Sequence, residues 1–178
     1  MAVHAKSRLK IKAFTHITAG VATALIVSDI THATLNHEVF IVAGGLLGSM
    51  LPDIGHPKSA FGSRLVPVST IISGIFGHRG ITHSLIATVA ITLGGWYFLH
   101  NTNVGFLEVG PFMVGISAGY LSHLLGDWMT NSGIPLLWPN RRRFVSPVRM
   151  FTGDLKEYVL ALLMYGWDIS QALSLSHG

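Results

Sequence analysis

The sequence predicts an all-α fold, a polytopic membrane helix bundle of about five spans with one short interfacial helix. Two observations lead to this prediction. Of the 178 residues, 49% are hydrophobic and only 11% are charged, whereas about a quarter of a typical soluble domain is charged. The hydrophobic residues also gather in long segments between short polar stretches. We expect residues 1–178 to form a single integral membrane domain in which residues 1–12 are a basic cytoplasmic segment.

The apolar segments define the expected elements in chain order. Five are candidate spans: Ala13–Ile30, Val39–Leu51, Thr82–His100, Val104–Met129 and Glu157–Leu175. A helix needs about 20 residues to cross a bilayer. The second segment is short by that measure, so it must begin earlier, near Ala33, or occupy a thinned or protein-lined position. The stretch Leu65–Phe76 is amphipathic and too short to span, which predicts the interfacial helix.

The distribution of positive charge predicts the orientation of the spans. All twelve Lys and Arg residues lie before the first segment, between the second and third, or between the fourth and fifth. The two remaining loops and the tail after Leu175 contain none. Alternating spans then place every cation on one side, which the positive-inside rule makes cytoplasmic. We expect a multi-pass protein of the bacterial inner membrane, with its N-terminus cytoplasmic and its C-terminus external.

Composition also excludes several classes of chemistry and partner. The chain has no cysteine, which rules out disulfides, thiolate catalysis and cysteine-based zinc sites. The segment Ala13–Ile30 contains His16 and Asp29 and has no clear cleavage site, so we expect no removable signal peptide. The positive net charge does not indicate nucleic acid, because the cations lie beside the spans and form no recognisable binding motif.

Imidazole and carboxylate side chains lie at the predicted cytoplasmic ends of four spans. The candidate metal ligands are His16, Asp53, His56, His83, His123 and Asp127. Ionisable residues beside lipid are expensive to keep and mark functional sites by default. Nitrogen and oxygen donors of this kind suit Zn, Mn or Fe better than Ca. Six candidates exceed one tetrahedral zinc site, so we expect one or two divalent ions, with Zn or Mn favoured.

Small residues predict which helix faces carry these ligands inward. In the fourth span Gly115, Gly119, His123 and Asp127 recur at intervals of four and share one face. Similar stripes start at His16 and His83, the latter continuing through Ala87, Ala90 and Gly94, and the second span contributes Gly44 and Gly48. Such stripes mark close helix packing in membranes. Taken alone, His16 could be a hydrogen-bonded core residue; convergence of the four segments favours a metal site.

Four motifs resemble those of the bacterial membrane-bound metal-dependent hydrolase family, whose best-known enterobacterial member is LexA-regulated. They are LPDIGHPKS at 51–59, GHRGITHS at 77–84, GYLSHLLGD at 119–127 and GIPLLWP at 133–139. The family's second motif usually has a second Asp where this chain has Gly55, which removes one carboxylate from the pattern. The resemblance implies an inner-membrane hydrolase that depends on a metal, and it leaves the substrate open.

The candidate catalytic residues are Arg79, His78 and His56. Arg79 has a planar fork suited to a phosphate or carboxylate, although snorkelling to lipid headgroups explains it equally well. His78 is a candidate general acid or base, with a solvated loop residue as the alternative. His56 is either a ligand or a residue that orients Asp53. Arg141–Arg143 follow Trp138 and fit the membrane interface, either meeting anionic headgroups or serving only as a topology anchor.

The leading hypothesis is therefore a metal-dependent hydrolase at the cytoplasmic membrane face that cleaves a phosphoester of a lipid or lipid-linked substrate. The phosphoester preference depends on Arg79 and on the headgroup level of the site. A non-catalytic protein in which the metal staples short helices together is the second hypothesis. A metal transporter is the third, and it is disfavoured because transport sites tend to lie near the midplane. The sequence leaves the oligomeric state open.

Overall fold

The computed structural model describes residues 2–57, 59, 62–64, 66–76, 80–102, 104, 107–148, 159 and 162–171. The described residues form helices and no strand; one isolated antiparallel bridge joins Ile134 to Phe144. The α-helices are α1 (Ala2–Ile30), α2 (Leu35–Gly48), α3 (Val66–Phe76), α4 (Leu85–Asn101) and α5 (Val109–Trp128). Three short 3-10 turns are η1 (Leu51–Gly55), η2 (Gly62–Arg64) and η3 (Ile81–His83), and residues 162–171 are also helical.

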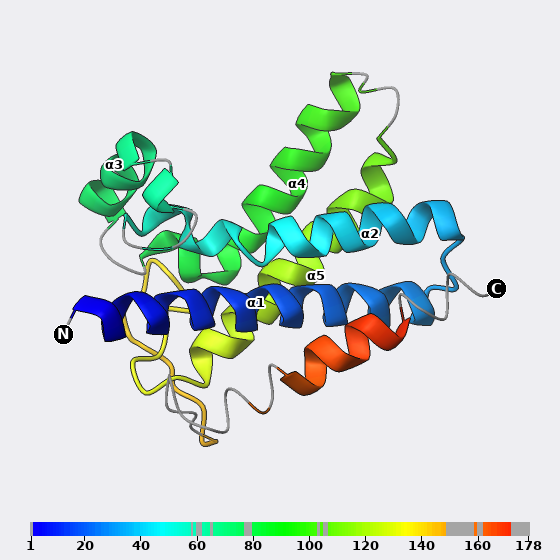
Figure 1. The fold of residues 1–178 in the computed structure, drawn as a ribbon. Coiled ribbons are helices and arrows are strands. Elements are labelled where there is room, and N and C mark those ends of the chain that lie inside the picture. The colour runs from blue at the N-terminus through cyan, green and yellow to red at the C-terminus, as the bar shows by residue number, and fades with distance from the viewer. Residues whose placement is uncertain are drawn as a thin grey trace.

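Helices α1, α2 and α5 lie side by side and form the centre of the bundle, whereas α4 diverges from α2 (Figure 1). The predicted small-residue faces of α2 and α5 meet directly. A Cβ atom built on Gly115 would lie 2.0 Å from the carbonyl oxygen of Ile41, and one on Gly119 would lie 2.0 Å from that of Gly45. These backbones therefore touch only because both positions lack a side chain.

The stripe predicted on α4 does not behave in the same way. Ala87 is buried, but Ala90 is exposed, and a Cβ atom on Gly94 would meet nothing within 4 Å. Helix α4 packs against α5 through neighbouring positions instead: the Thr92 hydroxyl lies 2.8 Å from that of Ser117, and a Cβ atom on Gly95 would lie 2.8 Å from the Met113 side chain. Small residues permit close packing, but they do not decide which face of a helix meets its neighbour.

The observed helix boundaries differ from the predicted segments at several ends. Helix α1 begins at Ala2, so the basic N-terminal residues continue the first helix. Helix α2 begins at Leu35, four residues before the predicted segment and close to the earlier start near Ala33 that a crossing would require. Thr34 caps it by accepting a hydrogen bond from the backbone N–H of His37 at 3.4 Å. Helix α4 begins three residues later than predicted because residues 81–83 form the turn η3 before the Ser84 cap.

The expectation of five spans is not supported by the described residues. Two stretches are long and apolar enough to cross a membrane, Ala13–Ile30 with 18 residues and Leu35–Gly55 with 21. Helix α4 has only 17 residues, below the 20 or so that a straight crossing needs. Helix α5 has 20 residues but ends in buried His and Asp side chains. The fifth predicted segment, Glu157–Leu175, is described at residues 159 and 162–171, which are helical.

The chain that follows α5 folds back onto the bundle and closes the end that carries the ligands. Ile134 is fully buried and packs with Ala87, Tyr120 and Leu124. The backbone N–H of Leu85, at the start of α4, donates to the carbonyl of Leu136 at 3.0 Å. These contacts tie the starts and ends of several helices together at one level, where the polar motifs also lie.

Candidate metal centre

The last turns of α5 bring His123 and Asp127 into the bundle interior, where both are almost fully buried. The Nδ1 atom of His123 lies 2.7 Å from the carbonyl oxygen of Ser49, at the end of α2. A carbonyl oxygen can only accept, so Nδ1 must carry the proton and donate it. The lone pair of His123 is then on Nε2, which is the arrangement found in metal-binding histidines whose other nitrogen is held by the protein.

Asp53 enters the site from the 3-10 turn η1, which directly follows α2. Pro52 occupies the first part of this turn, where its fixed backbone angle is compatible with a helical start. The backbone carbonyl of Asp53 accepts two hydrogen bonds, from the N–H of His56 at 3.0 Å and from the hydroxyl of Ser59 at 2.8 Å. The motif therefore holds the Asp53 backbone in place while its side chain faces the cluster.

His83 enters from the turn η3, which precedes α4. Its Nδ1 atom lies 3.2 Å from the hydroxyl of Thr82. The hydroxyl of Tyr120, on α5, donates to the carbonyl of Thr82. Ser84 both caps α4 and donates to the carbonyl of Ile81 at 2.6 Å. The peptide units that lead into His83 are thus fixed by hydrogen bonds.

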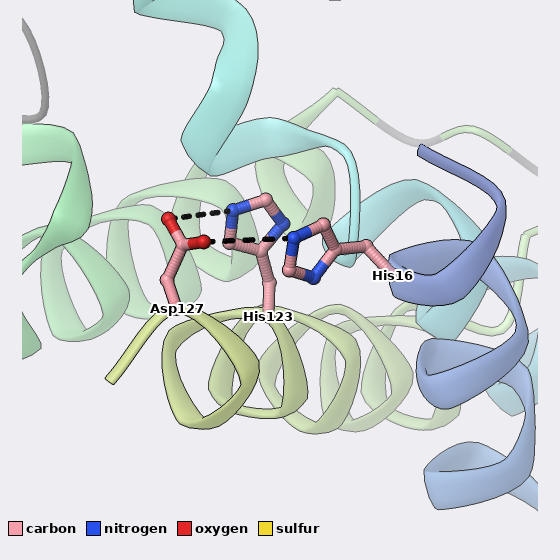
Figure 2. A group of neighbouring side chains, drawn as sticks. All are labelled: His16, His123 and Asp127. Atoms are coloured by element: carbon pink, nitrogen blue, oxygen red, sulfur yellow. Dashed lines mark ion pairs between the residues drawn. The ribbon is translucent and has the colours of Figure 1, made fainter. Parts of the chain in front are cut away.

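The five side chains converge on one small volume. The Nε2 atom of His83 lies 3.2 Å from Asp127 Oδ2 and 3.8 Å from Asp53 Oδ1. The Nε2 atom of His123 lies 3.8 Å from Asp127 Oδ2 and 4.0 Å from Asp53 Oδ1. His16 reaches across from α1, with Nε2 at 3.7 Å from Asp127 Oδ1. Figure 2 shows His16, His123 and Asp127, with the two imidazole rings stacked at 3.9 Å between centroids.

The donor atoms form two groups that share His123: His16, His123 and Asp127 in one, and Asp53, His83 and His123 in the other. Within each group the candidate ligand atoms all lie within 4.8 Å of one another. Asp127 contributes to both sides, because Oδ1 is near His16 while Oδ2 is near His83 and His123. The arrangement is compatible with one ion or with two ions on either side of Asp127.

The unsatisfied atoms provide a test of whether the residues fit a metal. Among the described residues, His83 Nε2 and His123 Nε2 are buried without a hydrogen-bond partner. Both face carboxylate oxygens at 3.2–4.0 Å. Atoms that share a tetrahedral ion at about 2.0–2.2 Å lie roughly 3.3–3.6 Å from one another. The donor chemistry and spacing therefore fit a divalent ion of the Zn or Mn type.

The members of the cluster differ in solvent exposure. The side chains of His83 and Asp127 are 1% and 4% exposed, whereas that of Asp53 is 30% exposed. Among these three side chains, Asp53 is therefore the one with the most contact with solvent.

The other candidate residues predicted from the sequence are not part of the described cluster. His56 is half-buried and belongs to neither donor group, although its backbone N–H binds the Asp53 carbonyl. Its ligand and catalytic roles stay predictions. His78 and Arg79 lie outside the described residues. Ser49 and Tyr120, which hold His123 and the His83 turn, were not identified from the sequence. Ser49 acts through its backbone carbonyl, which carries no residue-type signal, and Tyr120 could be noticed only by its position one turn before His123.

Sequence comparisons relate the chain to inner membrane proteins of two enterobacteria and to an uncharacterized protein. The chain is 40% identical over 130 residues to the inner membrane protein YdjM of Escherichia coli (strain K12) and to that of Shigella flexneri, in each case covering 72% of this chain and 65% of the relative. It is 32% identical over 149 residues to the uncharacterized protein YvsG of Bacillus subtilis (strain 168), covering 82% of this chain and 84% of that protein.

The match thus spans slightly under two thirds of the length of the enterobacterial relatives. No solved structure matches the chain. Residues 11–176 match the sequence profile of a single family and include every residue of the cluster. The chain belongs to the YdjM inner membrane protein family.

Proposed function

We propose that this protein is a membrane-bound, metal-dependent hydrolase whose His/Asp site lies at the cytoplasmic face of the inner membrane. The observation that carries the proposal is the pair of buried Nε2 atoms of His83 and His123, which satisfy no hydrogen-bond geometry and lie 3.2–4.0 Å from the carboxylates of Asp53 and Asp127. Buried nitrogens without a well-formed hydrogen bond are costly, and a bound cation would satisfy both of them. His16 completes the ligand set from α1.

The proposed chemistry is hydrolysis. A divalent ion bound in this site would acidify water and polarise an oxygen of the substrate. The protein would contribute ligand orientation through the Ser49 carbonyl and the fixed η3 turn, and it would exclude bulk water from the inner side of the cluster. Access beside Asp53 gives the substrate an approach from outside the bundle.

The proposed substrate class is a phosphoester of a lipid or lipid-linked molecule. Support comes from the position of the cluster at the end of the helices, where lipid headgroups would lie, and from Arg79 in the GHRGITHS motif. In this proposal Arg79 binds the phosphate through its planar fork, and His78 transfers protons. His56 orients Asp53 or joins the ligand set.

We further propose that the chain crosses the membrane five times. Helix α4 presents Leu93, Tyr97 and Phe98 outward, with 63–69% of each exposed, a composition suited to lipid contact. Residues 162–171 lie along α1 and run toward its C-terminal end (Figure 1), and Tyr165 contacts Phe14 with ring centroids 5.5 Å apart. This is the place that a fifth span would occupy.

A non-catalytic metal staple is the second candidate. It is favoured by the origin of the five clustered side chains, which come from four separate elements, α1, η1, η3 and α5. An ion held by four elements would stabilise their association whether or not any reaction occurred there.

The experiment that separates these candidates combines elemental analysis with a screen of phosphoester and carboxyester substrates. Asp127→Asn should release most of the metal, whereas the matched control Asp29→Asn, an exposed carboxylate at the other end of α1, should retain it. For an enzyme, Arg79→Lys should keep metal content and thermal stability while lowering turnover at least tenfold, roughly the loss of one charge-assisted hydrogen bond.

Two results would count against the proposal. An Arg79→Lys variant that is unchanged in every activity found would favour the staple, in which Asp127→Asn acts mainly by lowering stability. Wild-type protein that binds no divalent ion under metal-replete conditions would overturn both candidates.

A further inference from the structure

The loop after α5 is closed by backbone hydrogen bonds and carries arginines at its tip. Ile134 and Phe144 exchange two backbone hydrogen bonds, at 3.1 and 2.9 Å, and close a hairpin over residues 134–144, named here the arginine hairpin. Ile134 is fully buried in the core beside Tyr120 and Leu124. The base of the hairpin is therefore anchored, and its tip has a defined position relative to the bundle.

The cations of the hairpin are presented outward. Arg141, Arg142 and Arg143 are all exposed. The guanidinium of Arg143 donates to the Ser132 carbonyl at 3.2 Å. In the described part of the chain, no hydrogen bond or ion pair involves the guanidinium of Arg141 or Arg142. These two side chains are therefore available for an external anion.

No acidic residue of the neighbouring sequence neutralises this charge. Residues 128–153 contain neither Asp nor Glu. The backbone N–H of Arg142 donates to the side-chain oxygen of Asn140 at 3.0 Å, which fixes the turn leading into the arginines. The hairpin is thus a positive surface of fixed shape.

An apolar edge accompanies the charge. Leu137 is 52% exposed in the turn that precedes the arginines, and Trp138 beside it is half-buried. Apolar and aromatic residues next to cations are the composition of the membrane interface, where the former enter the acyl boundary and the latter meet phosphates.

The hairpin also lies at one end of the bundle, beside the start of α4 and the end of α5. Its backbone is hydrogen-bonded to the start of α4, through the Leu136 carbonyl, and the N–H of Ser146 beyond it donates to the carbonyl of Trp128 at the end of α5. In Figure 1 the yellow-to-orange segment lies at the same end of the bundle as α3 and the N-terminal half of α1. This is the end that the charge distribution of the sequence predicts to be cytoplasmic.

We propose that the arginine hairpin is a docking surface for the headgroups of anionic phospholipids in the leaflet on its own side of the membrane. The charge complementarity, the exposed Leu137 and the fixed turn together select a lipid surface. The proposal requires neither a bound metal nor hydrolysis, so it stands if the proposed function fails.

The test uses the full-length protein in micelles that contain equal amounts of phosphatidylglycerol and phosphatidylcholine with matched acyl chains. Native mass spectrometry counts the molecules of each lipid that remain bound. The wild type should retain phosphatidylglycerol in preference, and the preference should weaken as salt is raised. Arg141→Gln with Arg142→Gln should lower affinity for phosphatidylglycerol about 25-fold, from roughly fivefold for each arginine.

The charge-preserving pair Arg141→Lys with Arg142→Lys is the matched control and should keep most of the preference. Arg143 is left intact in both pairs because its bond to Ser132 belongs to the hairpin itself. Equal retention of both lipids by the wild type would overturn the proposal without any variant. The proposal would also be overturned if the double Lys variant lost the lipid preference as completely as the double Gln variant. That result would indicate one phosphate bound bidentately by an arginine guanidinium.

Discussion

His83 and His123 each engage one ring nitrogen within the protein and leave the other facing the carboxylates. The engaged atoms are Nδ1 in both cases, near the Thr82 hydroxyl and the Ser49 carbonyl respectively. A buried polar atom without a partner costs about 1–3 kcal/mol. Two such atoms directed at the same pair of carboxylates are therefore hard to explain as core packing, and a shared cation explains both at once.

Tyr120→Phe is predicted to weaken metal binding without removing a ligand. The Tyr120 hydroxyl donates to the Thr82 carbonyl and so fixes the peptide that leads into His83. Losing one hydrogen bond costs about 1 kcal/mol, and a displaced ligand should lower metal affinity about tenfold, the low end of the range for groups that orient ligands. Titration of the apo protein with cobalt would measure the affinity, and the visible spectrum would report the altered ligand geometry.

Tyr97→Phe provides the matched control, because it makes the same chemical change at an exposed position on α4. A purely structural role for Tyr120 would lower thermal stability while leaving the cobalt spectrum of the folded protein unchanged. That outcome would contradict the assignment of Tyr120 as a positioning residue for His83.

At the scale of the elements, the spacing of small residues predicted the closest helix contacts but assigned the α4 stripe to the wrong face. Gly115 and Gly119 meet α2 backbone as expected, yet Gly94 on α4 faces open space, whereas a Cβ atom on Gly95 would lie against Met113 of α5. The sequence reports how closely a helix face can be approached, but which face of α4 meets α5 depends on how the two helices dock. That docking has no local sequence signal.

Gly119→Ala is predicted to destabilise the bundle and disturb the metal site together. The added Cβ would lie 2.0 Å from the Gly45 carbonyl oxygen, so α2 and α5 must separate. Overpacking of this kind costs about 1–3 kcal/mol. His123 is one turn further along α5 and donates its hydrogen bond to the carbonyl of Ser49, which caps α2, so separation should also reduce the metal content. Thermal unfolding in detergent and elemental analysis would measure the two effects.

Gly94→Ala is the control for this prediction, because a Cβ there meets nothing within 4 Å. It should leave the metal content unchanged and raise stability slightly, since Ala favours a helix over Gly by about 0.8–1.0 kcal/mol. Equal behaviour of the two variants would show that helix propensity outweighs the close contact of α2 with α5.

At the scale of the whole molecule, the candidate ligands could be predicted because each lies at or beside one end of a predicted span, although His16 is within the longer helix α1. His16, Asp53, His83, His123 and Asp127 are brought together as that argument expected. Whether they bind an ion stays a prediction. The sequence could not supply Ser49 or Tyr120 as their supports, because those contacts join segments far apart in the chain. It also could not establish the number of spans, since α4 is shorter than a typical crossing.

The proposed topology makes the final prediction, that the two ends of the chain lie on opposite sides of the membrane. All twelve Lys and Arg residues lie before the first predicted span, between the second and third, or between the fourth and fifth. A different number of crossings would place some of these cations on the outer side, against the positive-inside preference. A reporter active only in the cytoplasm should work when inserted within residues 59–62 and fail when fused after Gly178. A reporter active only outside should show the reverse. Both fusions reporting one compartment would require an even number of crossings between these positions, which would remove either α4, α5 or the C-terminal segment from the set of spans. The cluster would keep its geometry in that case, but residues 162–171 beside α1 could no longer be part of a fifth crossing.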